Sequence, residues 1–183
     1  FPLATDFFKK TGSFSVIGAV SGTDLKAKVT ITIDSLKNFV SDSSFESGDI
    51  WKNTKWNLED TKSSLQIEKN KANVHSENNS ISYWKDSNFN FKIYQKIDGL
   101  ENGTYKLSVW SMGEKGKKSL YLYSNNGSLE NKTSVIDSGW SKWNKFEINN
   151  INVVNGSLEI GIYGNCMSGD WGKIDSFELI RIK

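Results

Sequence analysis

The 183-residue sequence has one cysteine, one histidine and one proline. With Cys166 alone no intrachain disulfide can form, and a zinc site made of cysteine and histidine lacks its ligands. A nucleophilic pair of Cys166 and His75 is formally open, although a lone cysteine is more often a small buried side chain. The sequence therefore offers no supply of imidazoles for acid–base catalysis.

An excess of one charge and long apolar runs are missing too. The 23 basic and 21 acidic residues are interspersed and leave a formal net charge of +2. This balance does not indicate a nucleic acid or an anionic membrane as partner. No apolar run approaches the length that crosses a bilayer. We expect neither nucleic acid nor membrane as a partner.

Aromatic residues, in contrast, are abundant, with 7 Trp, 6 Tyr and 10 Phe. Phenylalanine fits a hydrophobic core, but every buried indole N–H needs a hydrogen-bond partner. A core of this size does not require seven such groups. We therefore expect part of the aromatic surface to contact a ligand.

Short alternating segments separated by turn residues dominate the chain. Residues 13–20 and 25–33 alternate around Gly22-Thr23-Asp24, which predicts a β-hairpin. Ten further strands are predicted at 50–58, 64–69, 80–84, 89–97, 103–111, 118–124, 132–137, 143–151, 157–163 and 173–182. No helical period of useful length is present. The predicted fold is all-β, a β-sandwich of jelly-roll type, with domain boundaries at 1–34 (hairpin), 35–41 (linker) and 42–183 (sandwich).

Strand alternation assigns the aromatic side chains to faces. Tyr83 and Tyr105 share a face with aliphatic neighbours and are predicted in the core. The opposite, outward face receives Trp84, Trp110, Tyr121, Tyr123 and Tyr163. Aromatic residues gathered on a surface are typical of an interaction site.

Two tryptophans are interpreted as ligand contacts: Trp84 on the outward face, and Trp171 in a Gly-Asp-Trp-Gly loop. For Trp110 and the three tyrosines, alternation leaves packing under loops equally open. Polar partners for a ligand are expected at Lys85, Asn125, Asn165 and Asp170. Four other tryptophans are interpreted as packing residues: Trp51, Trp56, Trp140 and Trp143.

Residues from about 39 to the end resemble carbohydrate-binding module family 61, the β-1,4-galactan-binding modules of bacterial endo-galactanases. The resemblance rests on short sequence motifs that occur in the same order along the chain: SFESGD (44–49), NVHS (73–76), SYW (82–84), NGTYKLSVW (102–110), GWSKW (139–143), VNG and IGIY (154–163), and GDWG with IDSFEL (169–179). Residues 1–33 separately resemble the last strands of a bacterial immunoglobulin-like domain, through residues 12–18 and 22–27. The hairpin is therefore interpreted as the remnant of such a domain.

These resemblances imply a non-catalytic module that directs a secreted glycoside hydrolase to β-1,4-galactan or a related galactose-containing polysaccharide. Flat aromatic rings would cover the C–H faces of the sugars, and the polar partners would take their hydroxyls. The module is expected to be extracellular, either free or attached to the cell surface, and monomeric within a larger multidomain enzyme.

A structural calcium ion is also implied by the resemblance, with Glu46 and Asp175 as ligands and Asp42 as a further one. The sequence departs from the family pattern around these positions. Glu77 stands where the family has Gly, Ser176 where it has a second acidic residue, and Asp42 where it has Asn. The alternative is that the carboxylates are solvated near a sheet edge.

Two other functions remain open from the residues. A glycosidase would need two carboxylates flanking the scissile bond, and four are available: Asp170, Asp175, Glu159 and Glu178. Nothing marks any of them as an acid in an apolar pocket. The second alternative is a protein-binding adhesive or spacer module of a cell-surface protein.

Overall fold

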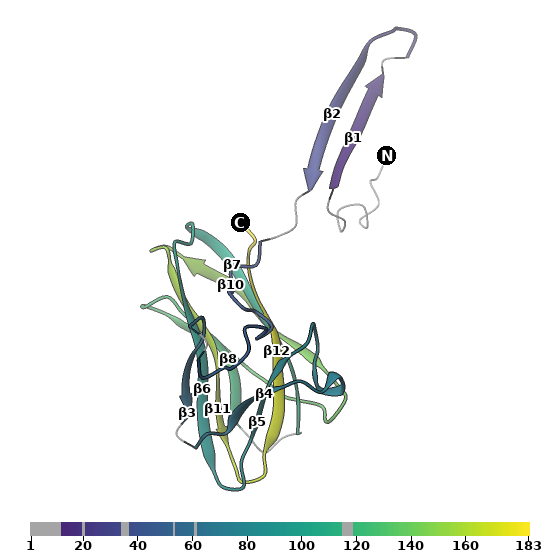
Figure 1. Cartoon of the computed structure of the whole chain (residues 1–183). Coiled ribbons are helices and arrows are strands. Elements are labelled where there is room, and N and C mark those ends of the chain that lie inside the picture. The colour runs from purple at the N-terminus through teal and green to yellow at the C-terminus, as the bar shows by residue number, and fades with distance from the viewer. Residues whose placement is uncertain (1–11, 20, 34–36, 53, 61, 115–118) are drawn as a thin grey trace. The chain divides into compact units, whose positions relative to one another are not determined.

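A computed structural model describes residues 12–19, 21–33, 37–52, 54–60, 62–114 and 119–183 (Figure 1). The chain divides into two units, Phe1–Lys37 and Asn38–Lys183. No helix in this described part of the chain is long and apolar enough to cross a membrane.

The second unit begins four residues before the predicted start at residue 42. The Phe39 N–H donates to the carbonyl of Leu179 at 2.9 Å, and the Asn38 amide donates to the carbonyl of Phe177 at 3.0 Å. Residues 38–41, expected in the linker, are thus tied to the last strand. Residues 35 and 36 of that linker lie outside the described residues.

The first unit contains an antiparallel hairpin of β1 (Gly12–Ala19) and β2 (Lys26–Ile33). The pairing runs from Gly12 opposite Ile33 to Ala19 opposite Lys26, so the predicted hairpin is confirmed. Two strands alone bury little apolar surface, and the side chains of Ile17, Leu25 and Val29 are exposed. The immunoglobulin-like origin of this unit stays a prediction.

The second unit contains two five-stranded antiparallel sheets. The β12 sheet has the order β10-β7-β12-β5-β4, and the β11 sheet has the order β3-β6-β11-β8-β9. Their strands are β3 (Asn57–Asp60), β4 (Leu65–Glu68), β5 (Ser80–Trp84), β6 (Phe89–Asp98), β7 (Gly103–Gly113), β8 (Ser119–Asn125), β9 (Glu130–Ser134), β10 (Asn144–Val153), β11 (Ser157–Cys166) and β12 (Trp171–Arg181). A single turn of 3-10 helix, η2 (Lys71–Asn73), lies between β4 and β5.

The two sheets pack face to face around one hydrophobic core (Figure 1). Alternation along the strands places one residue in two inside, because successive side chains of a strand point to opposite faces. The fully buried residues include Ile81, Tyr83, Tyr105, Leu107, Val109, Leu122, Ile160, Ile162, Ile174 and Leu179. The predicted β-sandwich is confirmed, as are the core positions of Tyr83 and Tyr105 and the buried state of Cys166.

The strand predicted at 50–58 is wrong for most of its length. Residues 49–52 form a turn, in which the Asp49 carboxylate accepts from the Trp51 N–H at 3.0 Å, and the strand begins only at Asn57. Trp56 is buried against Phe45 and Phe177, with ring centroids 5.2 and 4.8 Å away. Trp56 is therefore a core residue, although it does not lie in a strand. The strand predicted at 132–137 lies at Glu130–Ser134.

Candidate functional site

An open hollow on the outer face of the β12 sheet gathers three tryptophans from distant parts of the sequence. Its volume is about 370 Å³, within the range of small-molecule sites. The lining residues are Gln66, Asn73, Ser82, Trp84, Trp140, Trp171 and Lys173. We call this hollow the tryptophan groove.

The strands β5 and β12 supply the centre of the tryptophan groove. Trp171 lies directly opposite Trp84, and Lys173 directly opposite Ser82. Of the residues between them, Tyr83 points its side chain into the core, and Gly172, directly opposite, has no side chain. Trp84 is 52% exposed. Directly opposite side chains on neighbouring strands are about 4.5–5.5 Å apart at Cβ, so both indoles border the same patch of surface.

Gly172 allows this packing, because a Cβ atom at that position would overlap the hydroxyl of Tyr83. The Tyr83 ring is fully buried and stacks at a tilt on Phe91, with 5.0 Å between centroids. The glycine therefore lets the large, fully buried side chain of Tyr83 lie directly under the strand that carries Trp171 and Lys173.

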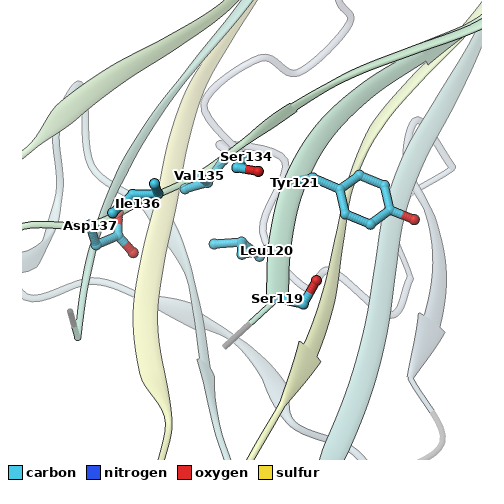
Figure 2. Close-up of a pocket in the computed structure, with 7 residues that line it drawn as sticks. All are labelled: Ser119, Leu120, Tyr121, Ser134, Val135, Ile136 and Asp137. Carbon is cyan, nitrogen blue, oxygen red and sulfur yellow. The ribbon is translucent and has the colours of Figure 1, made fainter. Parts of the chain in front are cut away.

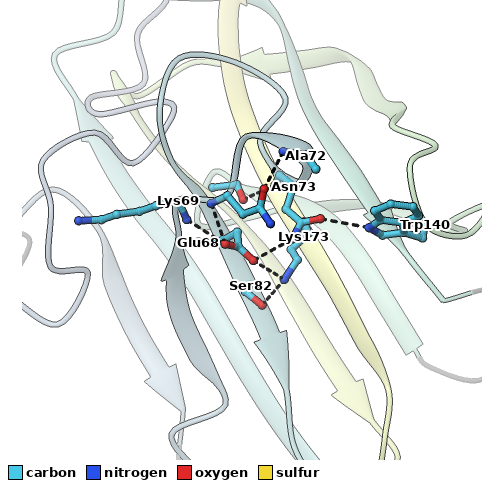
Figure 3. Close-up of polar contacts among 9 residues, drawn as sticks. Glu68, Lys69, Ala72, Asn73, Ser82, Trp140 and Lys173 are labelled. Carbon is cyan, nitrogen blue, oxygen red and sulfur yellow. Dashed lines mark hydrogen bonds and ion pairs between the residues drawn. The ribbon is translucent and has the colours of Figure 1, made fainter.

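A polar network forms the floor of the tryptophan groove (Figure 3). The Lys173 ammonium lies 3.1 Å from Glu68 Oε2 and donates to Ser82 Oγ at 2.7 Å. The Asn73 amide donates to Glu68 Oε2 at 3.0 Å. Glu68 Oε1 accepts from the backbone N–H groups of Lys69 and Asn70 at 3.0 and 2.9 Å. One carboxylate thus anchors the Lys173 side chain and the segment that carries Asn73.

The same network fixes Trp140. Its indole N–H donates to Asn73 Oδ1 at 3.1 Å (Figure 3), although the ring itself is 62% exposed. The loop before β10 is held by a further hydrogen bond, which the Gly139 N–H donates to the carbonyl of Gly113 at 3.0 Å. The interpretation of Trp140 as a packing residue is wrong, because its ring lies on the surface. Trp51, also interpreted as packing, is 51% exposed and lies outside the groove.

The charges within the floor cancel. Lys173 is the only charged residue among the seven that line the groove, and Glu68 neutralises it. Burial by itself would raise the pKa of Glu68, but hydrogen bonds from Asn70, Lys173 and Asn73 outweigh it and hold that pKa below its ordinary value. The carboxylate is therefore ionised at neutral pH, and the groove suits an uncharged ligand with hydroxyl groups.

Trp110 lies on the same face of the β12 sheet but not in the groove. Its ring stacks on His75 with 4.1 Å between centroids and an interplanar angle of 19°. His75 in turn meets the edge of Trp143 at 5.4 Å. Trp143 packs against His75, as the packing interpretation expected. One face of the Trp110 ring is covered by the His75 imidazole.

The four polar residues expected beside the ligand do not line the groove. Asp170 is buried, and its carboxylate accepts from the Met167 N–H at 2.8 Å, within the turn before β12. The carbonyl of Lys85 accepts from the Gly169 N–H at 2.8 Å. Asn125 Oδ1 accepts from the Gly127 N–H at 2.7 Å, which shapes the turn after β8. Asn165 is exposed on the other sheet, at a small hollow beside Asn90.

The three predicted tyrosines lie on the outer face of the β11 sheet, across the sandwich from the tryptophan groove. Tyr121 and Tyr163 are half-buried, with ring centroids 5.2 Å apart. Tyr123 was expected outside but is only 3% exposed, and its hydroxyl donates to Glu159 Oε1 at 2.8 Å. The pKa of Tyr123 is raised above its ordinary value, mainly because the side chain is buried. The predicted aromatic set therefore forms two separate surfaces.

Two of the carboxylates expected to bind calcium accept hydrogen bonds from one loop. Glu46 Oε1 accepts from the N–H groups of Asn78 and Asn79 at 2.8 and 2.7 Å. Asp175 Oδ2 accepts from the N–H groups of His75 and Ser76, both at 2.9 Å. Burial raises the pKa of Asp175 to about 6, although the N–H groups act in the opposite direction.

Calcium takes six to eight oxygen ligands. In the described part of the chain, no group of three or more His, Cys, Asp or Glu side chains could hold a metal ion. Asp42 accepts from the Ser47 N–H at 3.0 Å, and the Lys71 ammonium contacts the Glu77 carbonyl at 2.6 Å and Asn78 Oδ1 at 2.8 Å. These contacts do not bring the three carboxylates together, and the calcium ion that the resemblance implies stays a prediction.

Sequence reasoning missed Trp140, Asn73, Lys173, Gln66, Ser82 and Glu68. Alternation could have placed Lys173 and Ser82, since each is two residues from a tryptophan already assigned to the outer face. Trp140 lies in a loop and Asn73 ends the 3-10 turn η2, and neither segment has a periodic signal.

No protein-family model and no curated protein sequence matches the chain. Among solved structures, the chain is similar to TmCBM61 in complex with β-1,4-galactotriose, with 30% identity and a TM-score of 0.73. The match covers 80% of this chain and 99% of the other.

Two further solved structures share the fold. The enzymatically active domain of bacteriophage CBA120 tailspike protein 4 has 17% identity and a TM-score of 0.60, over 79% of this chain and 21% of the other. A family 16 carbohydrate-binding module has 12% identity and a TM-score of 0.55, over 79% of this chain and all of the other. At these identities the likeness shows the fold alone. The identity to TmCBM61 over nearly its whole length shows more: the chain belongs to carbohydrate-binding module family 61.

Proposed function

We propose that this protein is a non-catalytic module that binds β-1,4-galactan, or a related galactose-containing polysaccharide, in the tryptophan groove. The observation that carries the proposal is the convergence of Trp84, Trp140 and Trp171 on one hollow with a polar, charge-neutral floor. The galactotriose bound by TmCBM61 supports the choice of sugar.

The chemistry of the groove matches that of a galactose unit. A pyranose ring presents C–H groups on its faces and hydroxyls on its rim. An indole covers the C–H face and removes apolar surface from water. Lys173, Gln66 and Asn73 offer donors and acceptors for the hydroxyls at the floor and walls. Because Glu68 and Asn73 fix Lys173 and Trp140 before a ligand arrives, little side-chain freedom is lost on binding.

The groove does not have the means for glycoside hydrolysis. Glycosidases place two carboxyl groups about 5–9.5 Å apart across the scissile bond, one of them protonated. Of the described residues that line the groove, none is Asp or Glu. Glu68 lies beneath, ionised and bonded to Lys173, so it has no proton to donate.

We further propose that the module acts as a monomer, outside the cell, as part of a longer enzyme that degrades the polysaccharide. Membership of family 61 supports this context, because the resemblance implies modules attached to secreted endo-galactanases. The separate unit Phe1–Lys37 before the sandwich is consistent with a multidomain protein.

Affinity electrophoresis tests the proposal. The protein is run in native gels that contain galactan, xylan, mixed-linkage glucan or no polysaccharide. We expect retardation by galactan only. Release of reducing sugar from galactan would instead support an enzyme, and equal mobility in all gels would contradict saccharide binding.

A further inference from the structure

The outer face of the β11 sheet carries a straight row of side chains that crosses all five strands. Tyr121 lies directly opposite Ser134 on one side and Tyr163 on the other. Tyr163 lies opposite Lys92, which lies opposite Glu59. With one residue from each strand and a strand spacing of about 4.8 Å, the row is about 19 Å long. We call it the tyrosine row.

Two inclined rings occupy the middle of the tyrosine row. The planes of Tyr121 and Tyr163 differ by 30°, and their centroids are 5.2 Å apart. Both side chains are half-buried, so part of each ring faces the solvent. The exposed Lys132 ammonium lies 5.3 Å from the Tyr121 centroid and adds a donor at the rim. This pair is an aromatic platform with a polar margin.

Hollows adjoin both ends of the tyrosine row. One, of about 370 Å³, lies between β8 and the residues after β9, with Ser119, Tyr121 and Ser134 among its lining (Figure 2). The other, of about 130 Å³, is lined by Glu59, Asn90, Phe91, Lys92 and Tyr163. A chain lying along the row would therefore meet hydroxyl, amide and charged groups on either side of the two rings.

A neighbouring row of residues lies beside the platform on the same face and contacts it, with 6.4 Å between the ring centroids of Tyr121 and Tyr123. Tyr94, Gly161 and Tyr123 lie opposite one another on β6, β11 and β8. A Cβ atom at Gly161 would come within 2.8 Å of both tyrosines, so the missing side chain lets them lie close over the strand. The Lys92 ammonium is 4.0 Å from the Tyr94 centroid and 3.0 Å from Glu159 Oε1.

The tyrosine row carries no surplus positive charge. Lys92 is neutralised by Glu159 at 3.0 Å and by Glu59 at 3.9 Å. An anionic ligand would have to compete with these carboxylates, whereas an uncharged polyol would not. Flat rings, flanking hydroxyl-binding groups and the lack of a surplus positive charge together fit a saccharide better than a peptide or a nucleic acid.

We propose that the tyrosine row is a second saccharide-binding site, on the face of the sandwich opposite the tryptophan groove, and that it takes an uncharged polysaccharide chain across the strands. The choice of galactan as its ligand rests on the proposed function. Two sites on opposite faces allow one molecule to bind two chains or two segments of one chain, which raises the avidity for polymer.

Isothermal titration with β-1,4-galactotriose counts the sites. We expect two sites in the wild type, one in Tyr121→Ala/Tyr163→Ala and one in Trp84→Ala/Trp171→Ala. Tyr163→Leu, which keeps most of the side-chain volume but has no flat ring, should also show one site. Melting curves for every variant show whether the fold is intact.

The two proposals fail in different ways. If both tyrosine variants bind like the wild type, the tyrosine row is overturned and the groove stands. If the tryptophan variant binds like the wild type while the tyrosine variants lose all binding, the groove is overturned and the row stands. A wild-type protein that binds no saccharide contradicts both.

Discussion

Trp84 and Trp171 lie directly opposite each other on β5 and β12, although they are 87 positions apart in the sequence. Of the next pair in register, Tyr83 points its side chain into the core, and Gly172 has no side chain. The pairing therefore presents two indoles on one side of the sheet while the other side stays packed. This relationship places the tryptophan groove on two neighbouring strands of the sandwich, a more rigid support than loops alone.

Loss of either strand tryptophan should remove binding without unfolding the protein. We expect Trp84→Ala and Trp171→Ala to weaken retardation by galactan at least about tenfold, which corresponds to about 1.4 kcal/mol of binding free energy. Because Trp84 is half exposed, the melting temperature of Trp84→Ala should stay within a few degrees of wild type. Trp51→Ala is the matched control, since Trp51 is 51% exposed but outside the groove, and it should bind normally.

Asn73 should act by positioning Trp140. Its Oδ1 atom accepts the indole N–H, so Asn73→Ala leaves Trp140 free to change rotamer. We expect weaker galactan binding in Asn73→Ala, with little further loss when Trp140→Ala is added to it. Full additivity of the two changes in a double-mutant cycle would contradict the coupling.

Glu68 should make stability depend on pH in the acid range. Its pKa in the folded state lies below the ordinary value of 4.5, so its contribution is complete at neutral pH and is lost as pH falls through the folded pKa. Glu68→Gln should lower the melting temperature at pH 7 and differ less from wild type near pH 3. A difference that is the same at both pH values would show that the charge is not responsible.

Gly172→Ala should destabilise the sandwich, because the new methyl group overlaps the Tyr83 hydroxyl. Overpacking of this kind costs about 1–3 kcal/mol, or several degrees in melting temperature for a domain of this size. Gly18→Ala is the control, since nothing lies within 4 Å of a Cβ atom there. An unchanged melting temperature for Gly172→Ala would contradict the described packing of Tyr83.

Chelation should leave the sandwich stable. Glu46 and Asp175 are occupied by N–H donors from residues 75–79, and the Lys71 ammonium contacts the same loop. We expect equal melting temperatures with EDTA and with added calcium. A marked rise with calcium would restore the structural ion that the resemblance implies.

Alternation along single strands predicted the outward position of Trp84 and the core position of Tyr83, because it depends only on the two-residue period of a strand. It could not predict that Trp84 meets Trp171, since strand order is decided by long-range packing. It also misjudged the exposure of Tyr123, which Lys92 and Glu159 cover from two other strands.

Loop residues were beyond this reasoning altogether. Trp140 is positioned by an acceptor 67 residues away. The metal prediction depended on likeness alone, and the local contacts of Glu46 and Asp175 involve backbone N–H groups that no sequence pattern reveals.

A crystal structure of the protein soaked with β-1,4-galactotriose tests the central claim most directly. The account predicts a sugar ring stacked on Trp84 or Trp171, with hydroxyls bonded to Lys173 or Asn73. Galactotriose bound elsewhere on the module, with no sugar between the three tryptophans, would contradict it.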